Sequence, residues 1–447
     1  MQLFKLKRHD KLPPAERLLA SLLCRDQERF KSCAYLLKSH NAEFIDLLLE
    51  HNLVSIVFHE LTIRGAVSIF KDLKEASLFS IMNNLRQKSA IETIAYHRFD
   101  EKFTRFISRI GELQDALIWL KGIVTSRTLF PPEITRISSD FDFFVLPGKA
   151  RQLEEAVNAA GYNRIYHDAG CCNQLGVGPT FGIEQAFFTP APEMVPSAVV
   201  GFENDGWPMV DVKFNPLDRG LRMVEIDRFI SNAILIKWNG IEFKAPDLLD
   251  QLMITLTHYE KDRFESWKSL VDIGVLVEKI GENPEQWAEF VRRCKVEGIQ
   301  TSCWAALFLA TERLSLQNVD EVLTALAPSQ INMAKKLFFF TVTALFYWNT
   351  SSLPMLVLNA AVADDSSRKV DALKKSIFPS KEFLSQYYAG GRSLSSVSAA
   401  PAMLAHWAVL FLPGGVVRHT FGKILWHEPD YQALTEAAEN GGTDQTD

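Results

Sequence analysis

The chain has 447 residues, of which 47% are hydrophobic and 23% charged, with a formal net charge of −6. This length is enough for two or three domains with sizeable cores, and the composition is that of a globular protein. The negative charge excludes a bulk electrostatic attraction to nucleic acid. Six cysteines without a Cys-x-x-Cys spacing argue against a disulfide framework or a zinc ribbon, and they favour a reducing cytoplasm.

No membrane or export segment is expected from the sequence. The amino terminus is basic but has no apolar run after it, so it does not resemble a signal peptide. Two apolar stretches, 337–348 and 399–412, are shorter than the about 20 residues that a membrane-spanning helix needs. We therefore expect buried helices in both stretches, with weak contact at a membrane surface as the alternative.

Residues 1–111 are predicted to form an N-terminal helical region. Pro13 and Pro14, followed by Glu16, are typical of a first helical turn, where proline fits and an acidic group complements the helix dipole. Apolar residues recur at helical spacing, and a long helical pattern extends over 77–111. A further helix is predicted over 112–129, with a Lys-Gly pair near its end, where glycine is a common terminator.

A strand with two acidic side chains is predicted at 140–146. Polar and apolar residues alternate there, so Asp140 and Asp142 share one face, while Phe141 and Phe143 share the other and enter a core. Two carboxylates about 7 Å apart along a strand repel each other unless a cation lies between them, and Mg²⁺ prefers such oxygen ligands. Alone, however, an Asp-x-Asp pair is more typical of an edge strand with hydrated carboxylates.

Further strands are predicted after a helix at 149–160. Residues 162–167 alternate like a strand, and the Gly- and Pro-rich segment 168–207 is predicted to be a loop over the substrate, containing a short strand at 185–189. In the alternating stretch 208–215, Asp211 and Lys213 share one face and apolar residues share the other. This pattern predicts a third acidic side chain on a half-buried strand.

Turn and helix signals follow in the second half of the chain. An Asn-Gly pair between two apolar runs predicts a hairpin of strands 234–238 and 241–244. A Pro-Asp pair then starts a helix that ends near His258. Helices are also predicted over 284–297, 301–314, 319–326 and 330–348.

These segments together resemble the uncharacterised nucleotidyltransferase family of the DNA polymerase β-like superfamily. The shared pattern is a Leu-Lys-Gly triplet at 120–122, a loop with an arginine at Arg136, the Asp-x-Asp strand, a helix that ends in Gly-Tyr, and a later strand with Asp211. Two departures are evident. The superfamily's common Gly-Ser pair is absent, and Lys213 stands where the family commonly has His.

The resemblance implies an α+β fold. A small mixed β-sheet at 112–245 would form the nucleotidyltransferase core, flanked by the N-terminal helical region 1–111 and a C-terminal helical domain at 246–433. The acidic, glycine-containing tail 434–447 is expected to be disordered.

The resemblance also implies site residues. The catalytic carboxylates, which would also hold two Mg²⁺ ions or alternatively Mn²⁺, are Asp140, Asp142 and Asp211. The expected nucleotide-binding residues are Lys121, Gly122, Arg136, Ser139 and Lys213. His258 and Lys268 are candidates for the acceptor side of the site or its surroundings. Each has an ordinary alternative: Lys121 as a hydrated surface charge, Arg136 as a partner of Glu133, and His258 and Lys268 as polar groups between packed helices.

The expected activity is the metal-dependent transfer of an NMP from an NTP, ATP by default, to a hydroxyl or similar group of a small molecule or peptide in the cytoplasm. Two alternatives from other classes stay open. One is a catalytically silent nucleotidyltransferase fold that binds a nucleotide or a partner. The other is a helical scaffold with chance aspartates, which would leave the three carboxylates far apart.

Overall fold

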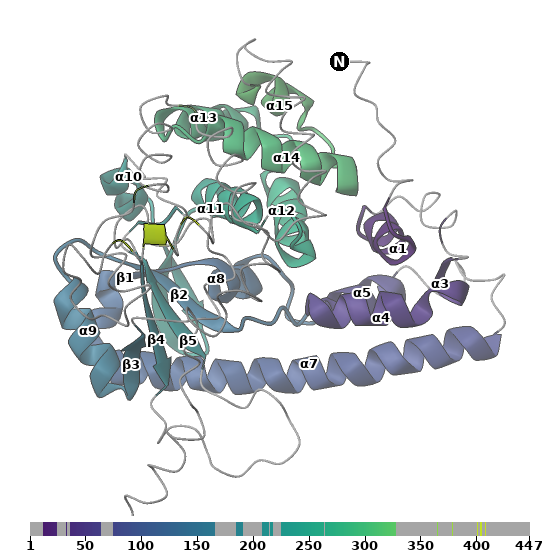
Figure 1. Ribbon diagram of the computed structural model, residues 1–447, viewed down its shortest axis with the longest axis horizontal. Helices are drawn as coiled ribbons and strands as arrows, with labels where there is room; N and C mark the ends of the chain where they lie inside the picture. Colours follow the sequence, from purple (N-terminus) through teal and green to yellow (C-terminus); the bar gives the residue numbers. More distant parts are fainter. Residues whose placement is uncertain are drawn as a thin grey trace, which may run out of the picture. The chain divides into compact units, whose positions relative to one another are not determined.

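The computed structural model describes residues 12–24, 33, 36–63, 75–165, 185–190, 208–213, 215–217, 225–262 and 264–327, and six isolated positions further on. The chain divides into two compact units, 1–164 with 183–330 and 165–182 with 331–447. The elements that follow are those of the first unit (Figure 1). The predicted helix 330–348 and tail 434–447, and most of the predicted covering loop, lie outside the described residues.

The N-terminal part is helical, as predicted. The described helices are α1 (Pro14–Leu23), α3 (Leu36–Ser39), α4 (Asn41–Glu50), α5 (Val54–Ile63) and α7 (Glu75–Ile110). Helix α7 has 36 residues, which corresponds to a length of about 54 Å. It runs beneath α4 and α5 and continues under the sheet (Figure 1), so one helix supports both the N-terminal helices and the sheet.

The described strands form one mixed, seven-stranded sheet in the order β3-β4-β5-β2-β1-β7-β6. Their bounds are β1 (Leu117–Trp119), β2 (Asp140–Val145), β3 (Tyr162–Ile165), β4 (Gln185–Pro190), β5 (Met209–Lys213), β6 (Ile234–Trp238) and β7 (Ile241–Ala245). Strand β2 is central, parallel to β5 and antiparallel to β1. The α+β prediction of a mixed sheet with helical flanks is therefore confirmed.

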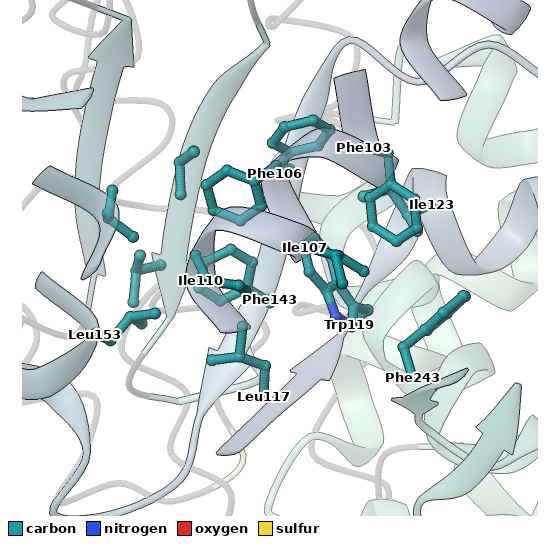
Figure 2. Packing of buried hydrophobic residues seen from close by; sticks show 14 of the residues in the cluster. Phe103, Phe106, Ile107, Ile110, Leu117, Trp119, Ile123, Phe143, Leu153 and Phe243 are labelled. Atoms are coloured by element: carbon teal, nitrogen blue, oxygen red, sulfur yellow. The ribbon is translucent and has the colours of Figure 1, made fainter. Parts of the chain in front are cut away.

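An aromatic core fixes which face of β2 points inward (Figure 2). Phe141 packs against Phe106 of α7 with ring centroids 5.0 Å apart, and Phe143 packs against Trp119 of β1 at 4.9 Å. Helix α9 (Ala150–Ala159) covers the same face through Leu153. Burying one such ring stabilises the fold by about 1.5–3 kcal/mol. A shift of register by one residue would expose these rings, so the core holds the acidic side chains on the opposite face.

The prediction of one helix over 112–129 is wrong. The structure has a 3₁₀-helix, η3 (Gly111–Ala116), then β1, and then α8 (Lys121–Thr128). Residues 117–119 are all buried, because β1 lies inside the sheet between β2 and β7. Lys121 therefore begins a helix, with a left-handed backbone φ of 48°, and Gly122 is not a helix terminator.

The hairpin and the later helices follow the sequence signals closely. Asn239 and Gly240 have φ values of 48° and 80°, as the tight turn between β6 and β7 requires. The described helices of this part are α10 (Ile226–Ser231), α11 (Leu248–Lys261), α12 (Trp267–Ile280), α13 (Pro284–Val296), α14 (Gln300–Leu314) and α15 (Asp320–Leu326). Asp247 caps α11 by accepting a hydrogen bond from the Asp250 N–H at 2.8 Å. Within the described residues, no helix combines the length and apolarity needed to cross a membrane.

Candidate active site

Strand pairing brings the three predicted aspartates to one face of the sheet. Asp142 of β2 lies directly opposite Asp211 of β5, and Asp140 lies opposite Met209. Neighbouring strands are about 4.8 Å apart, and partners in register point to the same face. Asp142 is 2% exposed and Asp211 is 5% exposed, while Asp140 is partly exposed. This juxtaposition is the opposite of what a helical scaffold with chance aspartates would show.

Two lysines contact the buried carboxylates. The Lys121 Nζ donates a hydrogen bond to Asp142 Oδ1 at 2.9 Å, and the Lys213 Nζ lies 3.6 Å from Asp211 Oδ2. Lys121 can reach β2 because β1 is its neighbour: the Leu120 N–H donates to the Asp142 backbone oxygen at 2.9 Å, just before the chain turns into α8. Both lysines were predicted as nucleotide contacts, and both lie beside the carboxylates.

The negative charges of Asp140, Asp142 and Asp211 repel one another. Burial and the charges of Asp140 and Asp211 raise the pKa of Asp142, the charges of Lys121 and Lys213 lower it, and the net result is a pKa of about 8. Among the described residues, no group of three or more His, Cys, Asp or Glu side chains is already arranged as a metal centre. The donors nevertheless fit a hard divalent cation, because they are carboxylate oxygens whose mutual repulsion a cation relieves.

Gly122 lets α8 approach the loop that precedes β2. A Cβ atom added at Gly122 would lie 2.2 Å from the Ser138 Oγ and 2.9 Å from the Ser138 Cβ. The Ser138 hydroxyl donates to the Asp140 backbone oxygen at 3.2 Å, and the exposed Ser139 hydroxyl donates to Asp140 Oδ1 at 3.2 Å. Gly122 thus acts here through packing, and Ser139 through contact with the first aspartate.

Arg136 is held by an aspartate on α12. Its Nε donates to Asp272 Oδ1 at 3.0 Å, its Nη2 donates to Asp272 Oδ2, and its Nη1 donates to the Ile137 backbone oxygen at 2.7 Å. Arg136 and Asp272 are both buried. The partner of Arg136 in the structure is therefore Asp272, rather than Glu133 of the alternative interpretation. The pair fastens the loop before β2 to α12.

The two acceptor-side candidates lie in different surroundings. The His258 Nε2 is 3.4 Å from Asp262 Oδ2, one turn further along at the end of α11. Lys268, in the first turn of α12, lies close enough to Asp140 and Asp142 for their charges to affect its pKa. Burial and the charge of Arg136 outweigh these carboxylates and lower the pKa of Lys268 to about 7. The structure thus associates Lys268 with the aspartates.

Sequence reasoning missed Glu92, which lies in the middle of α7. Its carboxylate accepts hydrogen bonds from the Val54 and Ser55 N–H groups at 3.3 and 2.7 Å, and so caps the start of α5. The Ser55 hydroxyl in turn accepts a hydrogen bond from the Thr135 N–H at 3.1 Å, in the loop before β2. Burial raises the pKa of Glu92, whereas the hydrogen bonds from Ser55 and Val54 and the charge of Lys268 lower it, and the net result is a pKa of about 7. A single Glu in a long polar helix carries no sequence signal for this role.

A comparison with protein families identifies the class of the chain. The family described as uncharacterised nucleotidyltransferase matches residues 38–315, more than half of the chain, including β1, β2, β5 and the three aspartates. No curated protein and no solved structure matches the chain. The resemblance noted in the sequence is thereby confirmed, and with it the prediction of a transferase. The chain belongs to the uncharacterised nucleotidyltransferase family.

Proposed function

We propose that this protein transfers a nucleoside monophosphate from an NTP to an acceptor, in a reaction that depends on a divalent cation and on Asp140, Asp142 and Asp211. Membership of the family supports the class of reaction. The observation that carries the residue assignment is the register of β2 and β5, which sets Asp142 beside Asp211 with Asp140 on the same face.

The three aspartates would hold the cation, Mg²⁺ in the first instance with Mn²⁺ as the alternative, through their carboxylate oxygens. When bound, two such ions neutralise charge on the triphosphate and lower the pKa of an attacking hydroxyl. Asp211 accepts the proton of the acceptor hydroxyl as its oxygen bonds to the α-phosphorus of the NTP and the α–β bridging bond breaks to release pyrophosphate. Lys121 and Lys213 donate charge-assisted hydrogen bonds to phosphate oxygens.

The nucleotide and the acceptor are proposed from the class of reaction. ATP is the default nucleotide, and the acceptor is a hydroxyl or similar group of a small molecule or peptide in the cytoplasm. The net charge of −6 gives no support for a polynucleotide acceptor.

Tracing a labelled nucleotide tests the proposal. The full chain is incubated with each NTP labelled at the α-phosphate, with Mg²⁺ or Mn²⁺ and a cell extract, and the label is followed into products. We expect D140N and D211N to abolish labelling while circular dichroism shows an unchanged fold. D227N, which alters an exposed aspartate of α10, is the matched control.

Two results would contradict the proposal. Labelling at the wild-type level by a folded D211N protein would show that the reaction does not require the aspartates. Nucleotide binding without labelling of any product would instead support a silent fold that binds nucleotide.

A further inference from the structure

Strand β6 ends the sheet, and its outer edge exposes apolar side chains. Among the described strands β6 is last in the order and has β7 as its neighbour. Ile234 is 41% exposed and Leu235 is 56% exposed. The edge of a sheet presents backbone N–H and C=O groups that can pair with another chain, and soluble proteins usually protect such an edge with charged side chains or proline. The edge of β6 thus has the character of a surface for strand pairing.

The charge that could protect this edge is already neutralised. Lys237 is the charged residue of β6, and its Nζ lies 2.5 Å from Glu242 Oε1 on the neighbouring strand β7. A lysine protects a strand edge because pairing would bury an uncompensated charge. Since Glu242 supplies the opposite charge, another strand can lie beside Lys237 without that cost.

The tight turn after β6 determines which backbone groups face the free edge. The turn closes on Trp238 and Ile241, which are partners in the register of β6 and β7, and the hydrogen bond of the turn joins this pair. In an antiparallel ladder, hydrogen-bonded and non-hydrogen-bonded pairs alternate. Leu235 and Lys237 therefore direct their N–H and C=O groups away from β7, toward the free edge.

A second copy of β6 complements these groups in antiparallel orientation. With a two-fold axis at Ile236, Leu235 lies opposite Lys237 of the second copy, so the outward groups of both strands meet. Ile234 lies opposite Trp238 of the second copy, and pairs of an aromatic with a β-branched side chain stabilise sheets. A shift that set Lys237 opposite its own copy would place like charges together. The charges therefore favour the register centred on Ile236.

We propose that the free edge of β6 binds β6 of a second copy of this chain, forming a two-fold symmetric dimer with one continuous sheet. Ile236 and Trp238 already pack against the hydrophobic core of the sheet, so the pairing extends an apolar face and covers the exposed Ile234. Two short strands make a small interface, and the dimer is therefore expected to be reversible. This inference concerns association of the chain and does not depend on the proposed function.

Sedimentation equilibrium of the full wild-type chain tests the dimer directly. The chain has a mass of 50.5 kDa, and we expect the weight-average mass to rise toward twice this value as the concentration increases from about 1 to 100 µM, a range suited to a weak interface. A mass equal to that of a single chain at the highest concentration would overturn the proposal without the need for any variant.

Two variants of Leu235 differ in the sign of the charge that they place opposite Lys237. L235K sets two lysines against each other and should raise the Kd of the dimer about tenfold or more. L235E sets a glutamate opposite Lys237 and should retain the dimer. I91K, at an exposed position of α7, is the control and should match the wild type, and circular dichroism checks that each variant is folded. Equal Kd values for L235K and L235E would overturn the proposal.

Disulfide formation tests the register. In the proposed dimer Ile236 faces its own copy in a non-hydrogen-bonded pair, with Cα atoms about 4.5 Å apart, which suits a disulfide. The two copies of Leu235 lie diagonally at about 7–8 Å, which does not. Under mild oxidation I236C should form a covalent dimer, whereas L235C and the wild type, which keeps its six cysteines, should not. A sedimenting dimer in which I236C forms no disulfide would overturn the proposal.

Discussion

Asp142 and Asp211 face the same side of the sheet as direct partners on the parallel strands β2 and β5. Both carboxylates are buried, and each has a lysine ammonium group within 4 Å. Such an arrangement costs stability, because removing carboxylates from water and placing them side by side favours their neutral forms.

Replacing Asp142 with Asn should raise the stability of the protein and abolish its activity. The folded-state pKa of Asp142, about 8, lies above its ordinary value of 3.8, so wild-type stability falls as the pH rises between these values. Asn cannot ionise, and D142N should therefore gain a few degrees in Tm relative to wild type between pH 5 and pH 8.5, while nucleotide transfer is lost. Thermal unfolding at the two pH values measures the effect. D227N should show no such change, and a constant difference between D142N and wild type would contradict the prediction.

Replacing Gly122 with Ala should destabilise the protein, although Ala normally favours a helix by about 1 kcal/mol. The new methyl group would lie 2.2 Å from the Ser138 Oγ, so α8 or the loop before β2 must move. Such overpacking costs about 1–3 kcal/mol. Thermal unfolding of G122A, S138G and the double variant checks this, because S138G removes both of the closest atoms. If the double variant is no more stable than G122A, the contact with Ser138 is not the cause.

Breaking the Arg136–Asp272 pair should cost more than replacing it. Each single variant, R136M or D272L, leaves a buried charge without its partner, which typically costs about 3–5 kcal/mol. The double variant R136M/D272L leaves no buried charge and should be more stable than either single variant. Unfolding temperatures of the four proteins form the test. Additive losses would show that the two side chains act independently.

Glu92 should make stability depend on pH in a way that Gln removes. Burial raises its folded-state pKa to about 7 from an ordinary 4.5, so the folded protein loses stability as the pH rises through this interval. The loss is about 3.5 kcal/mol at most, at about 1.4 kcal/mol per pKa unit. The Tm of E92Q should therefore fall less than that of wild type between pH 4.5 and pH 7.5. E101Q, at an exposed position of the same helix, is the control, and its Tm should fall with pH as much as that of wild type. An equal fall in the Tm of E92Q would show that the Glu92 carboxyl group is not the titrating group.

Local patterns predicted the strands that carry the aspartates and the tight turn at Asn239 and Gly240, because alternation and turn residues are written in neighbouring positions. They failed at Leu117 to Trp119, where β2 and β7, distant in sequence, determine the strand. The partner of Arg136 was missed for a similar reason, since Asp272 lies 136 positions away. Long-range pairings of this kind depend on the finished fold, whereas the Asp-x-Asp face depends only on the pleat of a strand.

The lysines of the site also determine how a nucleotide would reach it. Formally, the charges of Lys121, Lys213 and Lys268 cancel those of Asp140, Asp142 and Asp211, which they contact or influence. A region without net charge produces little field beyond the screening length of about 8 Å at physiological salt. A polyphosphate would then be neither drawn in nor repelled from a distance, and its rate of encounter would change little with ionic strength. Selection of the nucleotide would begin only at contact, when phosphate groups replace Asp142 and Asp211 as the neighbours of the Lys121 and Lys213 amines.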